Sequence, residues 1–331
     1  MMLRSSLAAL LLLAAQTSVA AAADCSKKVE LCRGQIAVEG LSATLYATLP
    51  LRDAHPEIRR ALVIIHGTDG NAESYFNTGL TATARSGHAA DTIVIAPHFA
   101  ELADPKSAPK GSLVWDRRSN WRFGELSSAA ISPRVHAFAV LDEILSPLAD
   151  RALYPNLERV ILAAHSAGAQ YLQRYAVASR DTPGLPPVTY IVANPSSLLY
   201  LDARRPVSGS AEFAVPPPSK CETNRYGYGF ERSNAYMKRD TAETEIARYR
   251  TRRVIYLAGE ADTDPNAANL SKTCQAMAQG PMRFARLTAF SHFMDAYYAP
   301  HNHRLVTVPG VGHSAGRMFT SPQGLAALFG E

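Results

Sequence analysis

The sequence predicts an α/β protein, with a mostly parallel central sheet and helices on both faces. Six short apolar runs are rich in β-branched residues and are continuous rather than alternating, which is typical of strands buried on both faces. Segments of helical periodicity lie between several of these runs. The composition, 47% apolar and 19% charged in 331 residues, excludes a predominantly disordered chain and allows a full-sized core.

The strands and helices follow in order along the chain. Residues 35–38 and 44–49 resemble antiparallel edge strands. The buried strands are expected at 61–65, 92–96, 160–164, 189–192, 253–257 and 305–308. Val135, Phe138, Leu141 and Leu145 recur at intervals of three and four, which predicts a helix before the third buried strand. Leu172, Tyr175 and Ala176 predict another helix after it.

Two insertions, 98–134 and 195–252, interrupt the strand–helix alternation. Both follow the carboxyl ends of predicted strands, where open α/β sheets bind their ligands. Long loops at this edge are more often functional than accidental. We therefore expect them to form the walls or a lid of a cleft within a single domain, 24–331. The alternative is a surface excursion held by a disulfide.

The first 23 residues have the pattern of a secretory signal peptide. Arg4 is their only charge, Leu7–Ala15 is an apolar run, and Val19–Ala23 are small residues. The run is too short for a bilayer, which needs roughly 20 residues. We expect a secreted or periplasmic protein without membrane insertion. Removing 23 of the 331 residues leaves 308, and the loss of Arg4 lowers the formal net charge from +5 to +4.

All four cysteines, Cys25, Cys32, Cys221 and Cys274, follow this leader. An even number in an exported chain predicts two disulfides, for which three connectivities exist. We expect Cys25–Cys32, which would fix the N-terminus, and Cys221–Cys274. Zinc is the competing interpretation, but no C-x-x-C is present and the spacings are irregular.

The segment 160–170 carries the most specific chemical signal. A buried strand leads directly into Ala164-His165-Ser166-Ala167-Gly168 and then into helical periodicity. This pattern matches a nucleophile elbow, G-x-S-x-G, with Ala164 in place of the first glycine. Small flanking residues let the strand and helix pass closely. The alternative is an ordinary helix-capping serine.

A nucleophilic serine requires a base and an acid that orients the base, which follow it in the order acid, then histidine. His313 lies in a glycine-rich loop after the last strand and is the expected base. Asp262 is the expected acid because it lies three residues after Gly259. Asp264 is the alternative acid.

Backbone donors for an oxyanion are expected at two places. One is the N–H of Ala167, directly after the serine. The other is the N–H of Thr68, in the loop that begins with His66-Gly67 after the first buried strand. His165, Asn71 and Tyr75 are expected to line the same site.

Other chemistries receive no support. No G-x-G-x-x-G opens a helix and no Walker A sequence exists, which argues against a dinucleotide or phosphate-binding loop. The basic residues are dispersed, so a nucleic-acid partner is not indicated. We expect no cofactor and no metal. The sequence does not specify an oligomeric state, and a homodimer is compatible with it.

The chain resembles the α/β-hydrolase superfamily from about Gln35 to Phe329. A narrower resemblance, to exported hydrolases that include the bacterial poly(aspartic acid) hydrolases, rests on strings at 66–72, 194–200, 221–229, 259–263, 274–280 and 308–313. Those enzymes cleave β-amide bonds of synthetic polyaspartate. The resemblance implies Ser166, Asp262 and His313 as a catalytic triad, and a Cys221–Cys274 disulfide. The departure from the family pattern is Ala164.

The charges of the insertions suggest an acidic polymer as substrate. The first insertion holds six basic residues against four acids, and the second holds ten against seven. Arg117, Arg118 and Arg122 would bind the carboxylates of a polyanion. The alternative is that these charges are solvated or paired locally.

Two further functions remain open. Trp115, Trp121 and Tyr226 would bind an apolar acyl chain in a secreted carboxylesterase or polyester depolymerase with the same triad. A catalytically inactive hydrolase fold that serves as a binding module is the third hypothesis.

Overall fold

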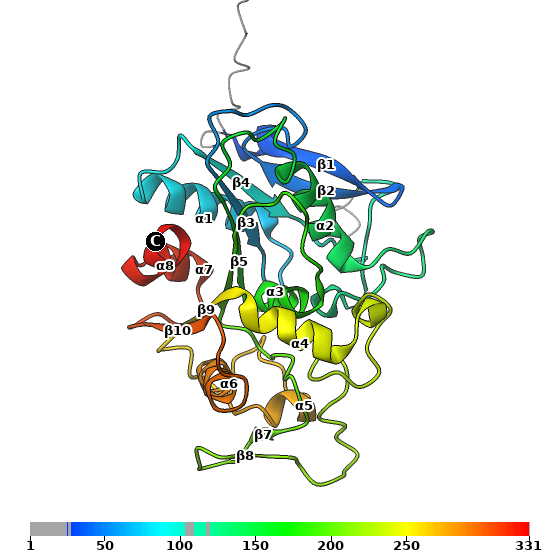
Figure 1. Ribbon diagram of the computed structural model, residues 1–331, viewed down its shortest axis with the longest axis vertical. Helices are drawn as coiled ribbons and strands as arrows, with labels where there is room; N and C mark the ends of the chain where they lie inside the picture. The colour runs from blue at the N-terminus through cyan, green and yellow to red at the C-terminus, as the bar shows by residue number, and fades with distance from the viewer. Residues whose placement is uncertain (1–24, 26–27, 103–108, 117–119, 331) are drawn as a thin grey trace, which may run out of the picture.

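The computed structural model describes residues 25, 28–102, 109–116 and 120–330. Within them, one sheet of eight strands forms the centre of the molecule, with helices on both sides (Figure 1). Its strands are β1 (Arg33–Val38), β2 (Leu41–Ala47), β3 (Arg60–Ile65), β4 (Thr92–Pro97), β5 (Arg159–His165), β6 (Val188–Ala193), β9 (Arg253–Gly259) and β10 (His303–Val308). The predicted leader, 1–23, lies outside the described residues.

The strand order is β1-β2-β4-β3-β5-β6-β9-β10. β1 and β2 form an antiparallel hairpin, and β2 pairs antiparallel with β4. All other neighbours are parallel. The mostly parallel α/β sheet predicted from the apolar runs is therefore confirmed. Both strands expected to be antiparallel are so, but only β1 is an edge strand, because β2 lies between β1 and β4.

Helices cover the two faces in separate groups. The helices are α1 (Ala72–Arg85), α2 (Ala137–Leu148), α3 (Ala167–Ala178), α4 (Ala242–Thr251), α5 (Cys274–Met277), α6 (Arg283–Tyr297), α7 (Ala315–Phe319) and α8 (Pro322–Phe329). Alternate residues of each central strand enter different cores, because successive side chains of a strand point to opposite faces. Val63 and Ile65 join the core under α2, α3, α4 and α6, whereas Leu62 and Ile64 join the core under α1, α7 and α8.

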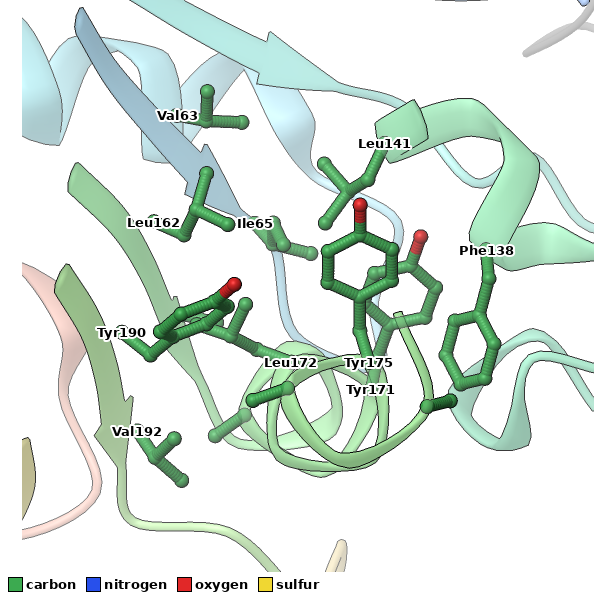
Figure 2. Packing of buried hydrophobic residues seen from close by; sticks show 14 of the residues in the cluster. Val63, Ile65, Phe138, Leu141, Leu162, Tyr171, Leu172, Tyr175, Tyr190 and Val192 are labelled. Atoms are coloured by element: carbon green, nitrogen blue, oxygen red, sulfur yellow. The ribbon is translucent and has the colours of Figure 1, made fainter. Parts of the chain in front are cut away.

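Helix α3 is the most deeply buried helix on its face. Every residue from Ala167 to Ala178 is buried. Tyr171 and Tyr175 lie side by side towards α2, and Tyr171 contacts the ring of Phe138 (Figure 2). The Tyr171 hydroxyl donates to the backbone oxygen of Ala137 over 2.9 Å, so burial leaves this polar atom satisfied.

The two predicted insertions differ in structure. Residues 98–134 contain, where described, the short helix η2 (Trp121–Phe123). Residues 195–252 contain the strand pair β7 (Arg205–Pro206) and β8 (Phe213–Ala214), then η3 (Met237–Arg239) and α4. Because α4 packs against α3, the last part of the second insertion belongs to the helical layer of the fold and is not a loop over a cleft.

Both expected disulfides are present, Cys25–Cys32 and Cys221–Cys274. The first joins the start of the described chain to η1 (Val29–Cys32). The second connects the insertion to α5 and closes a loop whose ends are 53 residues apart in sequence. A closed loop of this length restricts the unfolded chain and so favours the folded state. None of the helices that the structure describes is long and apolar enough to cross a membrane.

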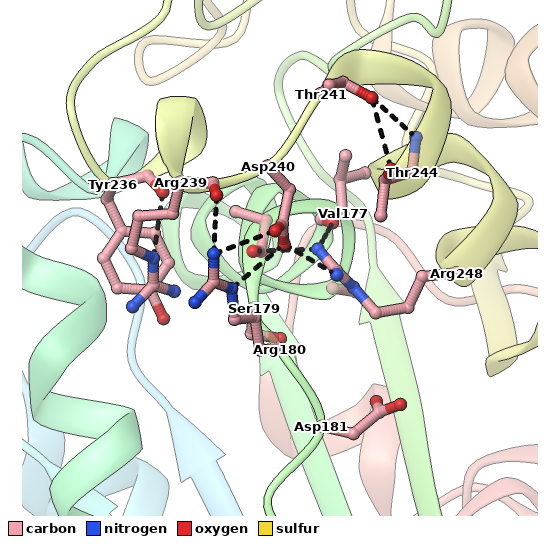
Figure 3. Close-up of polar contacts among 12 residues, drawn as sticks. Val177, Ser179, Arg180, Asp181, Tyr236, Arg239, Asp240, Thr241, Thr244 and Arg248 are labelled. Carbon is pink, nitrogen blue, oxygen red and sulfur yellow. Dashed lines mark hydrogen bonds and ion pairs between the residues drawn. The ribbon is translucent and has the colours of Figure 1, made fainter.

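An ionic contact fixes α4 to the end of α3. Arg180 and Arg248 both bind the carboxylate of Asp240, each over 2.9 Å (Figure 3). These two guanidinium groups lower the pKa of Asp240 to about 2.

Glu245, one turn further along, forms no ion pair among the described residues. It is 1% exposed, and its Oε1 makes no hydrogen bond to any described residue. Burial raises the pKa of Glu245 to about 8.

The Glu245 carboxyl should make the stability of the protein depend on pH. In the unfolded chain it ionises near its ordinary pKa of 4.5, whereas in the folded protein it holds its proton to about pH 8. Folding stability should therefore fall as pH rises between these two values. Glu245→Gln removes this effect, and we expect a melting temperature several degrees above wild type at pH 9 and little change at pH 4.

The matched control is Glu243→Gln in the same turn of the helix. Glu243 is exposed and its pKa is lowered by a backbone hydrogen bond, so neutralising it should give no gain at pH 9. Melting curves at pH 4, 6 and 9 measure the difference. An equal pH dependence in Glu245→Gln and wild type would contradict this interpretation.

Candidate active site

Ser166 lies on a sharp turn between β5 and α3, as the elbow pattern predicts. Its backbone has φ 57° and ψ −117°, a conformation that L-residues rarely adopt. Gly168 makes this turn feasible: a Cβ atom there would lie 2.5 Å from the backbone oxygen of His66 and 2.6 Å from that of Ile65. Helix α3 therefore passes directly over the end of β3, and only glycine fits at the crossing.

A hydrogen-bonded chain joins Ser166, His313 and Asp262. Nε2 of His313 lies 2.9 Å from the Ser166 hydroxyl, and its Nδ1 lies 2.7 Å from Oδ2 of Asp262. The ring thus accepts from the serine and donates to the carboxylate. Of the two acids considered from the sequence, Asp262 occupies this place; Asp264 is exposed and binds the backbone of Asn266.

The acid is held in a buried setting by Arg283 of α6. Asp262 is 4% exposed and Arg283 is 1% exposed, with 3.4 Å between the guanidinium and Oδ1. Burial lowers the pKa of Arg283, and Asp262 acts in the opposite direction. Nothing in the local sequence around Arg283 indicates this partnership, since it depends on how α6 packs beside the loop after β9.

Asn194 links the ends of two strands to the histidine loop. It follows β6 with a positive φ of 46°. Its Oδ1 accepts from the N–H of Gly259, and its Nδ2 donates to the backbone oxygen of Gly312, next to His313. A polar residue directly after a buried strand is the only sequence signal for this role.

The loop 66–70, which carries Thr68, is fixed by the buried side chain of His66. Nδ1 of His66 donates to the oxygen of Gly67 over 2.7 Å, and Nε2 accepts from the N–H of Phe99 over 2.9 Å. Burial, and then His98, lowers the pKa of His66 to about 3, so the ring stays neutral and keeps this pair of bonds. No hydrogen bond from the Thr68 N–H reaches another described residue.

The N–H of Ala167 is also available to a ligand. Ala167 is the first residue of α3, and the first N–H groups of a helix have no acceptor within it. Both expected oxyanion donors therefore lie in segments that meet at Ser166: Gly67 precedes Thr68, and an ideal Cβ on Gly67 would lie 3.6 Å from the Cβ of the serine.

Two of the expected lining residues lie next to this centre. His165 is 3% exposed, and its ring centroid is 4.4 Å from that of His313. The hydroxyl of Tyr75 lies 3.1 Å from Nδ1 of His165. Asn71 instead lies at the start of α1, where it lines a surface pocket of about 540 Å³ together with Tyr46 and His98.

The aromatic residues expected in the cleft are core residues instead. Trp115 and Trp121 are 1% and 2% exposed, and Trp121 stacks on Phe99 with 4.7 Å between ring centroids. Tyr226 is 7% exposed and its hydroxyl donates to the oxygen of Phe123. The sequence places these residues in loops. In the structure, η2 of the first insertion packs against α3, and Tyr226 of the second insertion packs against η2, so the rings are covered.

The three arginines expected to bind carboxylates divide into two groups. Arg117 and Arg118 lie outside the described residues. Arg122 is half-buried on η2, where its Nε donates to Asn120 over 2.8 Å. Burial lowers the pKa of Arg122, against the effect of Glu101.

Many basic residues of the second insertion are paired locally. Arg204, Arg232 and Arg248 form ion pairs with Asp202, Glu222 and Asp240. Arg205 is buried and donates to backbone oxygens, including that of Tyr228. The alternative of local pairing therefore accounts for part of the basic excess. No group of three metal-binding side chains occurs among the residues that the structure describes.

The crossing of α3 over β3 gives a testable prediction. Gly168→Ala should lower the free energy of unfolding by about 3 kcal/mol, because the added methyl group overlaps two backbone oxygens that cannot rotate away. Gly316→Ala is the control: it lies in α7 with open space around it, so it should be neutral or slightly stabilising. Urea denaturation at 25 °C measures both, and similar values for the two variants would contradict the prediction.

Comparison with known proteins relates this geometry to a family. The model of the alpha/beta hydrolase family matches residues 62–328. A search of the curated proteins gave no match. Among solved structures, LpqC, a poly(3-hydroxybutyrate) depolymerase from Bordetella parapertussis, is 22% identical with a TM-score of 0.60, over 86% of each chain.

Poly(aspartic acid) hydrolase-1 from Sphingomonas sp. KT-1 is equally similar in fold. It is 20% identical with a TM-score of 0.60, over 86% of this chain and 95% of that one. At these identities the likeness concerns the fold. The family match extends from β3 to α8 and includes Ser166, Asp262 and His313, so the chain belongs to the alpha/beta hydrolase family.

Proposed function

We propose that the protein is an exported serine hydrolase that cleaves amide bonds within an anionic polymer of the poly(aspartic acid) type. The observation that carries the hydrolytic part is the hydrogen-bonded chain from Ser166 through His313 to Asp262. A nucleophile, a base and a buried acid in this arrangement are the components of acyl transfer through a covalent intermediate.

In the first half of the proposed reaction, the Ser166 oxygen attacks the carbonyl carbon of the substrate and its proton passes to Nε2 of His313. Asp262 stabilises the resulting imidazolium through Nδ1. The carbonyl oxygen becomes an oxyanion, which the N–H groups of Thr68 and Ala167 would bind. His313 then gives its proton to the leaving nitrogen, the C–N bond breaks, and an acyl-serine remains.

In the second half, water takes the place of the leaving amine. His313 removes a proton from the water as the water oxygen attacks the acyl carbon. Collapse of the second tetrahedral intermediate breaks the bond to Ser166, and the serine oxygen recovers its proton from His313. The products are a carboxylic acid and an amine, and the enzyme returns to its starting state.

The anionic polymer is supported by the basic excess of the two insertions and by the fold shared with a poly(aspartic acid) hydrolase. Arg122 is the described residue that we assign to carboxylate binding, since it has no ion pair among the described residues and lies beside Trp121, whose ring is 5.1 Å from that of His66. Export is proposed from the N-terminal leader pattern and agrees with two disulfides.

A polyester depolymerase with the same triad is the second candidate. The equal structural likeness to a poly(3-hydroxybutyrate) depolymerase favours it. The aromatic residues expected to bind its apolar acyl chain do not support it. Their rings are buried in the core: Trp115, Trp121 and Tyr226. A binding module without activity would not need a serine, a histidine and an acid joined by hydrogen bonds.

The assignment of the acid can be tested with a pair of matched variants. Asp262→Asn should lower kcat about 10⁴-fold, since an amide leaves His313 in the wrong tautomer. Asp264→Asn, two residues away and exposed, should keep nearly full activity. Ser166→Ala should abolish turnover. Initial rates of amide or ester cleavage measure all three, and equal losses in the two aspartate variants would refute the assignment.

The substrate class can be tested by a substrate panel at two salt concentrations. Purified protein is incubated with polyaspartate, with a neutral polyester and with p-nitrophenyl esters, and product sizes are followed. We expect internal cleavage of polyaspartate that slows from low to high salt, because screening weakens the attraction of the polyanion. Arg122→Gln should raise KM for polyaspartate but not for a neutral ester.

The ion-paired Arg232 provides the control for this experiment. Arg232→Gln, on an exposed arginine already bound to Glu222, should leave KM for polyaspartate unchanged. Rapid cleavage of the polyester with no action on polyaspartate would overturn the amide proposal and favour the second candidate.

A further inference from the structure

The site contains two buried polar side chains to which the proposed reaction gives no task, Tyr75 and His165. Tyr75 projects from the first turn of α1 and is 6% exposed; His165 is the last residue of β5 and is 3% exposed. Their side chains meet at the hydroxyl of Tyr75, which lies 3.1 Å from Nδ1 of His165. They join α1, which follows the loop 66–70, to β5, which leads into Ser166.

The Tyr75 hydroxyl also reaches the loop that holds Thr68. An ideal Cβ on Gly67 would lie 2.9 Å from this oxygen. Burial raises the pKa of Tyr75, and a hydrogen bond from the Gly67 backbone acts in the opposite direction. The Tyr75 oxygen therefore lies against the backbone of Gly67 as well as within hydrogen-bond distance of Nδ1 of His165.

The ring of His165 lies against the ring of His313. The centroids are 4.4 Å apart and the planes are inclined by 37°. Burial, then His313 and Arg283, lower the pKa of His165 well below its ordinary value, so the ring stays neutral. A neutral ring can support His313 in both of its charge states, whereas a charged one would repel the imidazolium.

Packing alone does not explain a histidine at this place. Nδ1 of His165 pairs with Tyr75, but Nε2 is buried without a hydrogen-bond partner among the described residues. Leaving a polar group unpaired in this way destabilises the folded state. An apolar side chain would avoid this cost, so packing does not account for a histidine at this position.

We propose that Tyr75 and His165 are positioning residues, which together hold the Thr68 loop and the His313 ring in register with Ser166. The proposal rests on the hydrolase function proposed above. Tyr75 fixes the peptide of Gly67, directly before the Thr68 donor, and fixes His165, which sets the position of His313. A displacement of either group matters because small errors in the placement of reacting groups cause large losses of rate.

Labelling of Ser166 by a fluorophosphonate probe tests this without knowledge of the substrate. The Ser166 oxygen forms a bond to phosphorus as fluoride leaves, and its proton passes to His313. We expect Tyr75→Phe and His165→Phe each to slow labelling about 10-fold or more. The double variant should be no slower than the slower single variant, because the two residues act as one unit.

Two measurements separate positioning from a purely structural role. Tyr154→Phe is the matched control: it also removes a buried hydroxyl, which donates to the oxygen of Leu51 over 3.1 Å, away from the site. It should lower the melting temperature and leave the labelling rate unchanged. With a cleaved substrate, Tyr75→Phe and His165→Phe should lower kcat and leave KM within about twofold.

The outcomes are distinguishable. If wild type is labelled and both single variants are labelled equally fast, the inference fails while the hydrolase proposal stands. If wild type is not labelled, the hydrolase proposal fails, and this inference with it. Circular dichroism checks that each variant is folded; should Tyr75→Phe fail to fold, His165→Phe decides the result alone.

Discussion

The close crossing of α3 over the end of β3 is the constraint on which the rest of the site depends. Glycine at position 168 brings the first turn of the helix against the backbone oxygens of Ile65 and His66. This contact fixes the strained turn at Ser166, which directs the hydroxyl towards the loop edge of the sheet. The same contact places the Ala167 N–H beside the loop that carries Thr68. A larger residue would separate two segments that must act together.

Buried charges support this geometry in a way that apolar packing could not. Asp262 lies in the interior beside the guanidinium of Arg283, so its charge is compensated while it binds His313. Elsewhere, Arg174 and Arg286 are fully buried and donate to backbone oxygens of Gly227 and Ser196. These contacts pin the second insertion to the helical layer. A guanidinium suits this task because it has five donors in a fixed plane.

The local sequence carried enough information for the elements and for the three central side chains. Continuous apolar runs predicted six strands, and five of them are buried in the sheet; the sixth, β10, is an edge strand in which only Val308 is buried. The small residues around Ser166 follow from backbone crowding, and Gly310 before His313 has a φ of 67°, which suits glycine. Spacing favoured Asp262 over Asp264. The sequence did not show that Asp262 is buried beside Arg283 of α6 whereas Asp264 is exposed.

The roles of residues in the insertions required the tertiary structure. Trp115, Trp121 and Tyr226 appeared available for a ligand because they lie in loops, yet each ring is covered by segments distant in the chain. Arg283, Asn194 and His66 support the site through contacts that join different strands and helices, and the local sequence does not show these contacts. The sequence by itself determined the fold class, the elbow, and the order of serine, acid and histidine along the chain. These depend on the periodicity, size and spacing of residues near one another in the chain. Only the tertiary structure decided which polar groups are buried, paired or near Ser166, because burial is set by what packs against a residue from elsewhere in the chain.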